Sequence, residues 1–208
     1  MGSDSILSSV QEYYDEKIRT HGPTARGVDW NSPESQQLRF AQLLKLIDHN
    51  RPFMLNDFGC GYGALVDYLQ RTDYQFHYTG FDISSQMIAK AQELHPTSDR
   101  IEFVHQKEQL RVADYTVASG VFNVKLSTTG EEWKQYILAT LETMNSLSRA
   151  GFAFNALTKY SDAEFMREDL YYSDPLFLFD HCKAKYSKFV ALLHDYPLYE
   201  FTILVRKE

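Results

Sequence analysis

Three closely spaced glycines behind an acidic residue form the segment of this sequence best suited to binding a cofactor. The run Asp57-Phe-Gly-Cys-Gly-Tyr-Gly63 lies between a short apolar stretch and a helical pattern. Glycines at such a turn let the backbone bend sharply and approach a ligand that a Cβ atom would obstruct. Asp82 ends the next predicted strand, 23 positions after Gly59, where its carboxylate can accept hydrogen bonds from ribose hydroxyls. This pattern predicts a nucleoside-containing cofactor across the carboxyl ends of the strands.

The glycine spacing alone is compatible with two cofactors. Gly59, Gly61 and Ala64 satisfy the G-x-G-x-x-A form of the dinucleotide fingerprint. Three other features favour S-adenosylmethionine. Asp57 would repel a pyrophosphate but can hold a cationic amino-acid portion, and Gly63 completes a G-x-G-x-G pattern. The third feature is a predicted antiparallel hairpin at the C-terminus, and an NAD(P)-dependent oxidoreductase remains the alternative.

Alternating strand and helix patterns surround the glycine turn and must position it. Short strands are predicted at 53–57, 77–82, 101–105, 115–119 and 151–155. Helices are predicted at 5–20, from 33 to about 50, and at 64–71, 86–94 and 131–147, and Asp174 can cap another that begins at Pro175. Strands separated by helices indicate a mostly parallel sheet. Residues 189–194 and 198–205 are two further strands, too close for a crossover helix and therefore antiparallel.

The whole chain is predicted to form one α/β domain, because no repeat, low-complexity tract or linker divides its 208 residues. Residues 1–34 are interpreted as an N-terminal helical cap, and residues 35–157 and 186–208 as the core. Residues 158–185 are interpreted as a lid or substrate-binding insertion. This stretch is far longer than the roughly dozen residues that the core needs there, and long insertions in compact domains are usually functional.

The composition excludes several classes of function. A net charge of −7, with no run of five like charges, disfavours a nucleic-acid binder. The longest apolar runs fall far short of the ~20 residues of a membrane span, and the first residues lack a secretory signal pattern. We therefore expect a soluble, cytoplasmic protein with no membrane partner. Cys60 and Cys182 lie 122 positions apart and the seven histidines are scattered, which gives a metal site no support.

Four segments in order resemble the class I S-adenosylmethionine-dependent methyltransferases. NDFGCGYG at 56–63 is similar to the first motif of the family, and GFDIS at 80–84 is similar to its second. ADYTVASGVF at 113–122 resembles the fourth-strand motif, and the terminal hairpin at 192–207 resembles that of the family. The resemblance covers about residues 35–157 and 186–208. It implies a Rossmann-like methyltransferase domain, with a seven-stranded sheet, helices on both faces, S-adenosyl-L-methionine as cofactor and S-adenosyl-L-homocysteine as product.

The resemblance also implies roles for individual residues. The methionine end of the cofactor would lie on Asp57 and the backbone of Gly59, Cys60 and Gly61, the ribose on Asp82, the adenine against Ile83, Gln106 and Lys107, and the sulfonium beside Ser119, Gly120 and Val121. Gln106 and Lys107 depart from the family, which often has a small acidic residue at that place. Cys60 is interpreted as a small turn residue rather than a nucleophile.

Methyl transfer requires an aligned nucleophile and, for a weak one, removal of a proton. The candidate catalytic residues are His21, Asn123, Tyr172 and His194, and the candidate substrate-binding residues are Tyr14, Trp30, Asn123, Tyr171 and Tyr172. We expect methyl transfer to an oxygen or nitrogen of a small molecule, such as a sugar, a natural-product intermediate or an amino-acid-like metabolite. The alternatives are the oxidoreductase and a non-catalytic or non-methylating S-adenosylmethionine-binding protein.

Overall fold

Seven strands form one sheet in the order β3-β2-β1-β4-β5-β7-β6. The structure is a computed structural model that describes residues 3–207. The strands are β1 (Phe53–Phe58), β2 (Phe76–Phe81), β3 (Ile101–Val104), β4 (Ala113–Ala118), β5 (Ser148–Leu157), β6 (Phe189–Leu193) and β7 (Glu200–Arg206). The first five strands run parallel, and β7 pairs antiparallel with both β5 and β6. This is the predicted mostly parallel sheet with a C-terminal antiparallel hairpin.

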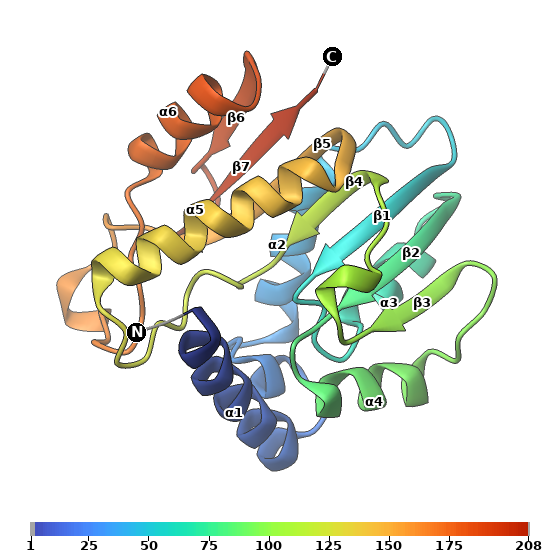
Figure 1. Cartoon of the computed structure of the whole chain (residues 1–208), viewed down its shortest axis with the longest axis horizontal. Helices are drawn as coiled ribbons and strands as arrows, with labels where there is room; N and C mark the ends of the chain where they lie inside the picture. Colours follow the sequence, from blue (N-terminus) through green and yellow to red (C-terminus); the bar gives the residue numbers. More distant parts are fainter. Residues whose placement is uncertain (1–2, 208) are drawn as a thin grey trace.

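Helices cover both faces of the sheet (Figure 1). The α-helices are α1 (Ser3–His21), α2 (Pro33–Leu44), α3 (Ala64–Gln70), α4 (Ser85–Leu94), α5 (Gly130–Ser146) and α6 (Pro175–Lys185), and three short 3-10 helices are η1 (Ala25–Val28), η2 (Lys107–Gln109) and η3 (Ala163–Phe165). Side chains alternate between the faces along each strand. Phe152 and Phe154 of β5 accordingly belong to the core under α5 and α6, and Ala153 to the core under α2, α3 and α4.

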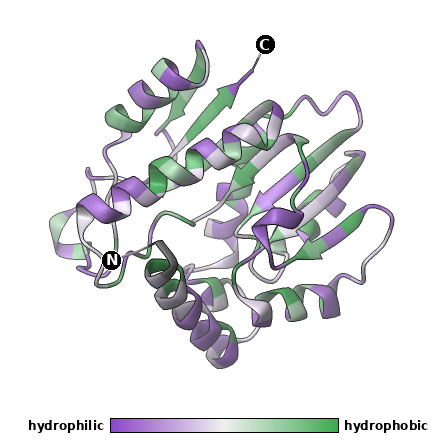
Figure 2. Cartoon of the chain, viewed as in Figure 1, coloured by the Kyte–Doolittle hydropathy of each residue, from purple (hydrophilic) through white to green (hydrophobic). Residues whose placement is uncertain are grey.

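The hydropathy of the ribbon follows this layering. Figure 2 shows hydrophobic residues gathered on the strands, β7 included, and a more hydrophilic α1. Among the described residues, no helix combines the length and apolar character that a membrane crossing needs. α1 packs on η1 and α4, at the end of the sheet toward which the parallel strands point (Figure 1).

Most predicted elements are confirmed within a few residues, and the exception has a local cause. Ser32 and Asp174 cap α2 and α6 as expected. α2, however, ends at Leu44 rather than near residue 50, because the chain after it forms tighter turns. There the amide of Leu46 donates to the carbonyl of Leu43, and that of Ile47 to Leu44.

The sheet register brings the functional segments to one edge. β1 pairs Asp57 with Gly80 of β2 and with Val117 of β4, so the loops after these three strands leave the sheet side by side. Since β7 runs antiparallel to β5, its first residue, Glu200, lies opposite Leu157 at the end of β5. Residues that are far apart in the sequence therefore meet at the carboxyl edge of the parallel strands.

Candidate functional site

The glycine turn after β1 has a backbone that only glycine adopts easily. Gly59, Gly61 and Gly63 have φ angles of 81°, 55° and 85°, in the left-handed region that side chains disfavour. A Cβ atom on Gly59 would lie 2.4 Å from Val121 Cγ2, and one on Gly61 would lie 2.9 Å from Val28 Cγ1. The turn therefore requires glycine both for its backbone angles and for the neighbours that approach it.

Asp82, at the end of β2, is tied to the glycine turn through its carboxylate. The amide of Gly61 donates to Oδ2 and the amide of Ser84 to Oδ1, each at 2.9 Å. Burial raises the pKa of Asp82 to about 6, although these two backbone hydrogen bonds act to lower it. The carboxylate is thus held in one orientation at the edge of the cavity beside the turn.

Asp57, at the end of β1, is a second buried carboxyl group below the turn. The Tyr78 hydroxyl donates a hydrogen bond of 2.7 Å to Asp57 Oδ2. Burial raises the pKa of Asp57 to about 7, and the hydrogen bond from Tyr78 acts against that rise. A cationic group that bound beside Asp57 would favour the ionised carboxylate.

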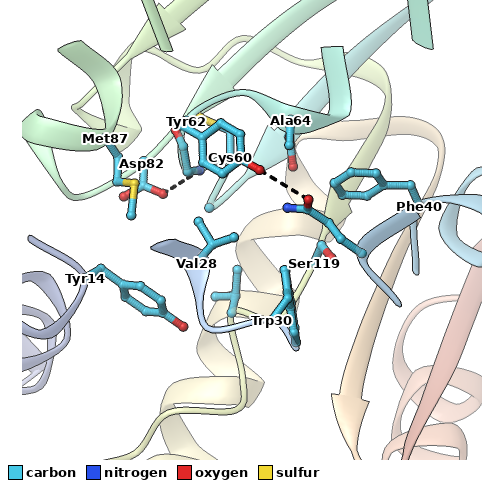
Figure 3. A pocket seen from close by; sticks show the side chains of 16 residues that line it. Tyr14, Val28, Trp30, Phe40, Cys60, Tyr62, Ala64, Asp82, Met87 and Ser119 are labelled. Carbon is cyan, nitrogen blue, oxygen red and sulfur yellow. Dashed lines mark hydrogen bonds between the residues drawn. The ribbon is translucent and has the colours of Figure 1, made fainter. Parts of the chain in front are cut away.

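Two adjoining cavities open at this edge of the sheet. The smaller, of about 70 Å³, surrounds the glycine turn and Asp82 (Figure 3). The larger, of about 510 Å³, extends towards the start of β7 and the 158–174 segment. Four residues line both cavities: Tyr14, Val28, Trp30 and Gly120. The side chains of Val28 and Trp30 therefore stand where the two cavities meet.

The segment that carries Val28 and Trp30 is held by α1 and α2. Asp29 accepts hydrogen bonds from the Tyr13 hydroxyl at 2.8 Å and from Lys17 Nζ at 2.6 Å. The guanidinium carbon of Arg39 lies 3.8 Å from the centre of the Trp30 ring. The indole also lies directly on Gly120, where a Cβ atom would come within 2.3 Å of its ring. These contacts place the indole against the loop that follows β4.

A buried polar network supports that loop from the other side. Arg39 Nε and Nη2 donate to the two carboxylate oxygens of Glu200, both at 2.8 Å. Asn155 Nδ2 donates to Glu200 at 2.9 Å, and Asn155 Oδ1 accepts from the amide of Gly120 at 2.7 Å. The side chain of Asn155 thus links the ion pair of Arg39 and Glu200 to the backbone of Gly120.

The structure brings most of the predicted cofactor residues together. Eight of them line the smaller cavity: Asp57, Gly59, Cys60, Gly61, Asp82, Ser119, Gly120 and Val121. Ile83 packs against the core beneath α5, outside both cavities. Gln106 and Lys107 lie at η2, also outside both cavities, and their contact with an adenine edge stays a prediction.

The predicted catalytic and substrate residues are divided between different places. Tyr14 and Trp30 line both cavities, and Asn123 and Tyr172 line the larger one. Tyr171 lines a separate cavity beside α5 and α6. His21 is exposed at the end of α1, and His194, beyond β6, contacts the Tyr160 ring. The structure does not bring either histidine to the two adjoining cavities.

Asn123 has partners that give it a positioning role. Its Oδ1 accepts a hydrogen bond of 3.1 Å from the amide of Leu157, and its Nδ2 lies 3.5 Å from Glu200 Oε1. The side chain is buried. It therefore joins the loop after β4 to the ends of β5 and β7.

Sequence reasoning missed Arg39 and Glu200, which are 161 positions apart. The available signal was weak: Glu200 is the single charged residue of the predicted strand 198–205, whereas Arg39 lies among glutamines in a helix that carries other charges. Such a charge is buried only when it is paired, but the sequence does not show which partner it has. Val28 was also missed, because its position against Gly61 depends on how the N-terminal segment folds back.

Comparisons with known proteins identify the kind of site this is. Residues 56–151 match a family described as a methyltransferase domain. The Mycobacterium tuberculosis protein Rv1506c, provisionally named a methyltransferase, is 52% identical over 164 residues, which cover 79% of this chain and 99% of that protein.

Solved structures show the same fold at low identity. Magnesium protoporphyrin IX methyltransferase from Synechocystis with bound S-adenosylhomocysteine is 16% identical, with a TM-score of 0.67 over 97% of this chain and 99% of that one. The N-methyltransferase NodS from Bradyrhizobium japonicum, in complex with S-adenosylhomocysteine, is 14% identical, with a TM-score of 0.65 over 94% and 97% of the two chains.

Proposed function

This chain belongs to the class I S-adenosylmethionine-dependent methyltransferases, and on that premise we propose that it methylates an oxygen or nitrogen atom of a small-molecule acceptor bound in the larger cavity. S-adenosylmethionine is the cofactor and S-adenosylhomocysteine the product. When bound, the cofactor supplies an electrophilic methyl group. Family membership decides against the NAD(P)-dependent oxidoreductase that the glycine spacing alone allowed.

The residues around the glycine turn fit this cofactor. The backbone at Gly59 and Gly61 leaves a surface free of Cβ atoms, and Asp82 is oriented beside it by two backbone amides. In this proposal Asp82 accepts hydrogen bonds from the ribose, and Asp57 faces the cationic amino-acid end. Gly120 and Trp30 then lie towards the sulfonium, at the junction with the larger cavity.

The observation that carries the proposal is the larger cavity itself. Its volume of about 510 Å³ lies within the ~300–1,000 Å³ typical of small-molecule sites, and it adjoins the cofactor residues at Gly120. Its walls include the N-terminal cap and the part of the insertion that precedes α6, from Ser161 to Tyr172. These two segments are proposed as the lid over the acceptor.

Tyr172 is the side chain best placed to orient an acceptor. Its hydroxyl oxygen accepts a hydrogen bond of 2.9 Å from the amide of Arg167. The hydroxyl hydrogen can therefore be donated to an acceptor in the cavity. Alignment of the acceptor with the methyl group is the main contribution that a protein makes to this reaction.

The cofactor must displace part of the N-terminal segment when it binds. A volume of about 70 Å³ is well below the ~300 Å³ lower limit of typical ligand sites. Val28 and Trp30 fill the space between the smaller and the larger cavity. We therefore propose that residues 25–31 shift away from Gly61 and Gly120 as the cofactor enters.

Titration and product formation test the proposal in sequence. Isothermal titration should show micromolar binding of S-adenosylmethionine and S-adenosylhomocysteine and no heat from NADH. Release of S-adenosylhomocysteine is then measured with sugars, phenols and amines as acceptors. The proposal is supported if S-adenosylhomocysteine is released only when an acceptor is present. The rate of this release should fall several-fold in Tyr172→Phe, while the affinity for the cofactor is retained. A proportional fall in cofactor affinity would instead assign Tyr172 to the cofactor site.

A further inference from the structure

The charges that line the larger cavity are already neutralised by partners within the protein. Four charged residues line it: Asp29, Arg39, Arg167 and Glu200. Arg39 and Glu200 pair with each other, Asp29 with Lys17, and Arg167 with Asp169 through a 3.0 Å bond from Nε to Oδ1. A carboxylate, phosphate or ammonium group in this cavity would lose water without gaining an unpaired counter-ion. The lining therefore favours an acceptor that is uncharged where it enters.

Uncharged polar groups provide the hydrogen bonding that remains. The Tyr172 hydroxyl keeps its hydrogen free for donation, since its oxygen accepts from the backbone. Asn31 and Ser161 also line the cavity. Groups of this kind suit a hydroxyl-bearing acceptor, which both donates and accepts hydrogen bonds.

The mouth of the same cavity carries large apolar side chains in an exposed position. Phe165 and Tyr199 line the cavity, although they are 61% and 44% exposed. Their ring centroids lie 6.1 Å apart, and the Tyr199 hydroxyl is fixed by a hydrogen bond to Asp162. We call Phe165 and Tyr199 the apolar rim.

The apolar rim continues into the cavity. Leu157, Pro197 and Leu198 line the wall of the cavity together with Phe165 and Tyr199. Exposed apolar patches of this kind commonly mark ligand-binding grooves. Because the rim is continuous with the proposed acceptor site, an apolar part of the acceptor can reach it from the cavity.

We propose that the acceptor is an uncharged amphiphile, whose hydroxyl-bearing end enters the larger cavity and whose alkyl or aryl arm lies over Phe165 and Tyr199. This inference rests on the proposed function. The acceptor oxygen forms the new bond to the methyl carbon, and the carbon–sulfur bond breaks with its electron pair going to sulfur. The hydroxyl proton leaves to water.

Alkyl glucosides of increasing chain length test the inference, because they keep one uncharged polar end and vary the apolar arm. Methyl, butyl, hexyl and octyl β-D-glucoside are titrated below their micellar concentrations into protein saturated with S-adenosylhomocysteine. The affinity for the glucosides should rise about twofold with each added methylene. Complete burial of a methylene would raise it about fourfold, but the rim leaves the arm partly exposed. Octanoate and octylammonium should bind at least tenfold more weakly than octyl glucoside.

Variants of the apolar rim and a matched control test whether the dependence of affinity on chain length arises at the rim. Phe165→Ser and Tyr199→Ser should each remove most of the chain-length dependence while leaving the affinity for methyl glucoside within twofold. Phe189→Ser is the control, because Phe189 is 54% exposed on β6 and lies outside the cavity. That variant should behave as the unmodified protein.

Four results would overturn the amphiphilic acceptor. They are affinity independent of chain length, no binding of octyl glucoside, an unchanged chain-length dependence in both rim variants, and tighter binding of a charged probe than of octyl glucoside. Titration of S-adenosylhomocysteine into each protein before the glucosides are added reports separately on the proposed function. Failure of that titration contradicts the methyltransferase site itself, whereas success without a chain-length effect contradicts only the amphiphile.

Discussion

The two adjoining cavities recognise their ligands by different means. The smaller one is centred on the backbone of the glycine turn, with glycines of positive φ and two carboxyl groups of raised pKa, Asp57 and Asp82. The larger one is built from side chains of the N-terminal cap, the insertion and β7, and its charges are paired internally. The comparison teaches that the cofactor site depends on the local geometry of one turn, whereas the acceptor site depends on long-range assembly.

The largest expected effect concerns the assembly of the larger cavity. Arg39→Met should lower the free energy of unfolding by about 3–5 kcal/mol, because it leaves the buried Glu200 carboxylate without its cation. Urea denaturation measures this loss. The double variant Arg39→Met with Glu200→Gln should be less destabilised than the sum of the two single variants. If the losses in unfolding free energy of the two single variants add up to that of the double variant, Arg39 and Glu200 are not energetically coupled.

The next largest effect concerns cofactor binding in the smaller cavity. Asp82→Ala should weaken S-adenosylhomocysteine binding by about 100-fold, since a charged acceptor of hydrogen bonds contributes about 1.5–3 kcal/mol per bond. Asp67→Asn is the control, because Asp67 is a surface carboxylate of α3 outside both cavities. Calorimetric titration that gave the same affinity for Asp82→Ala and the control would refute the ribose contact.

A rise in pH is expected to affect folding and cofactor binding in opposite directions, because it ionises the carboxyl groups of Asp57 and Asp82. Their pKa values of about 7 and 6 lie above the ordinary aspartate value, so the folded protein retains protons that the unfolded chain has lost. Their contribution to stability is therefore complete below about pH 4 and is lost as the pH rises through 6 and 7.

Cofactor binding should instead strengthen over the same interval. A cationic ligand end prefers the ionised Asp57 carboxylate, so affinity for S-adenosylhomocysteine should rise by up to tenfold per pH unit below pH 7 and then level off. Titrations from pH 5.5 to 8.5 measure this profile. Asp57→Asn should flatten its upper part, and a profile identical to that of the unmodified protein would remove Asp57 from the site.

The smallest effect concerns the boundary between the cavities. Val28→Ala removes methyl groups that lie against Gly61, so fewer contacts must break when the cofactor binds. Affinity for S-adenosylhomocysteine should rise about two- to fivefold, with a faster association rate in stopped-flow measurements. A loss of affinity would mean that Val28 holds the bound cofactor rather than the closed segment.

The sequence predicted the fold well because the signals for its elements are local. The glycine turn, the caps at Ser32 and Asp174, and the alternation of strands and helices each act over a few residues. The smaller cavity followed from the same signals, since Asp57 and Asp82 end neighbouring strands.

The larger cavity was only partly predictable. Trp30 and Tyr172 were identified as substrate residues from the segments that carry them, and both line it. The pairing of Arg39 with Glu200 was not identified, because it depends on the antiparallel insertion of β7 beside β5. The histidines His21 and His194 were candidates by residue type alone, and tertiary folding carries both away from the cavities.

The fluorescence of Trp30 provides the most direct test of the junction between the two sites. Its indole lies on Gly120, where cofactor and acceptor are proposed to meet, while the second tryptophan, Trp133, is buried in the core between α5 and the sheet. Titration with S-adenosylhomocysteine should produce a saturable change in emission that is absent from Trp30→Phe, with NADH silent in both proteins. An equal change in Trp30→Phe, or none in the unmodified protein at saturation, would contradict the placement of the cofactor beside Trp30 and Gly120.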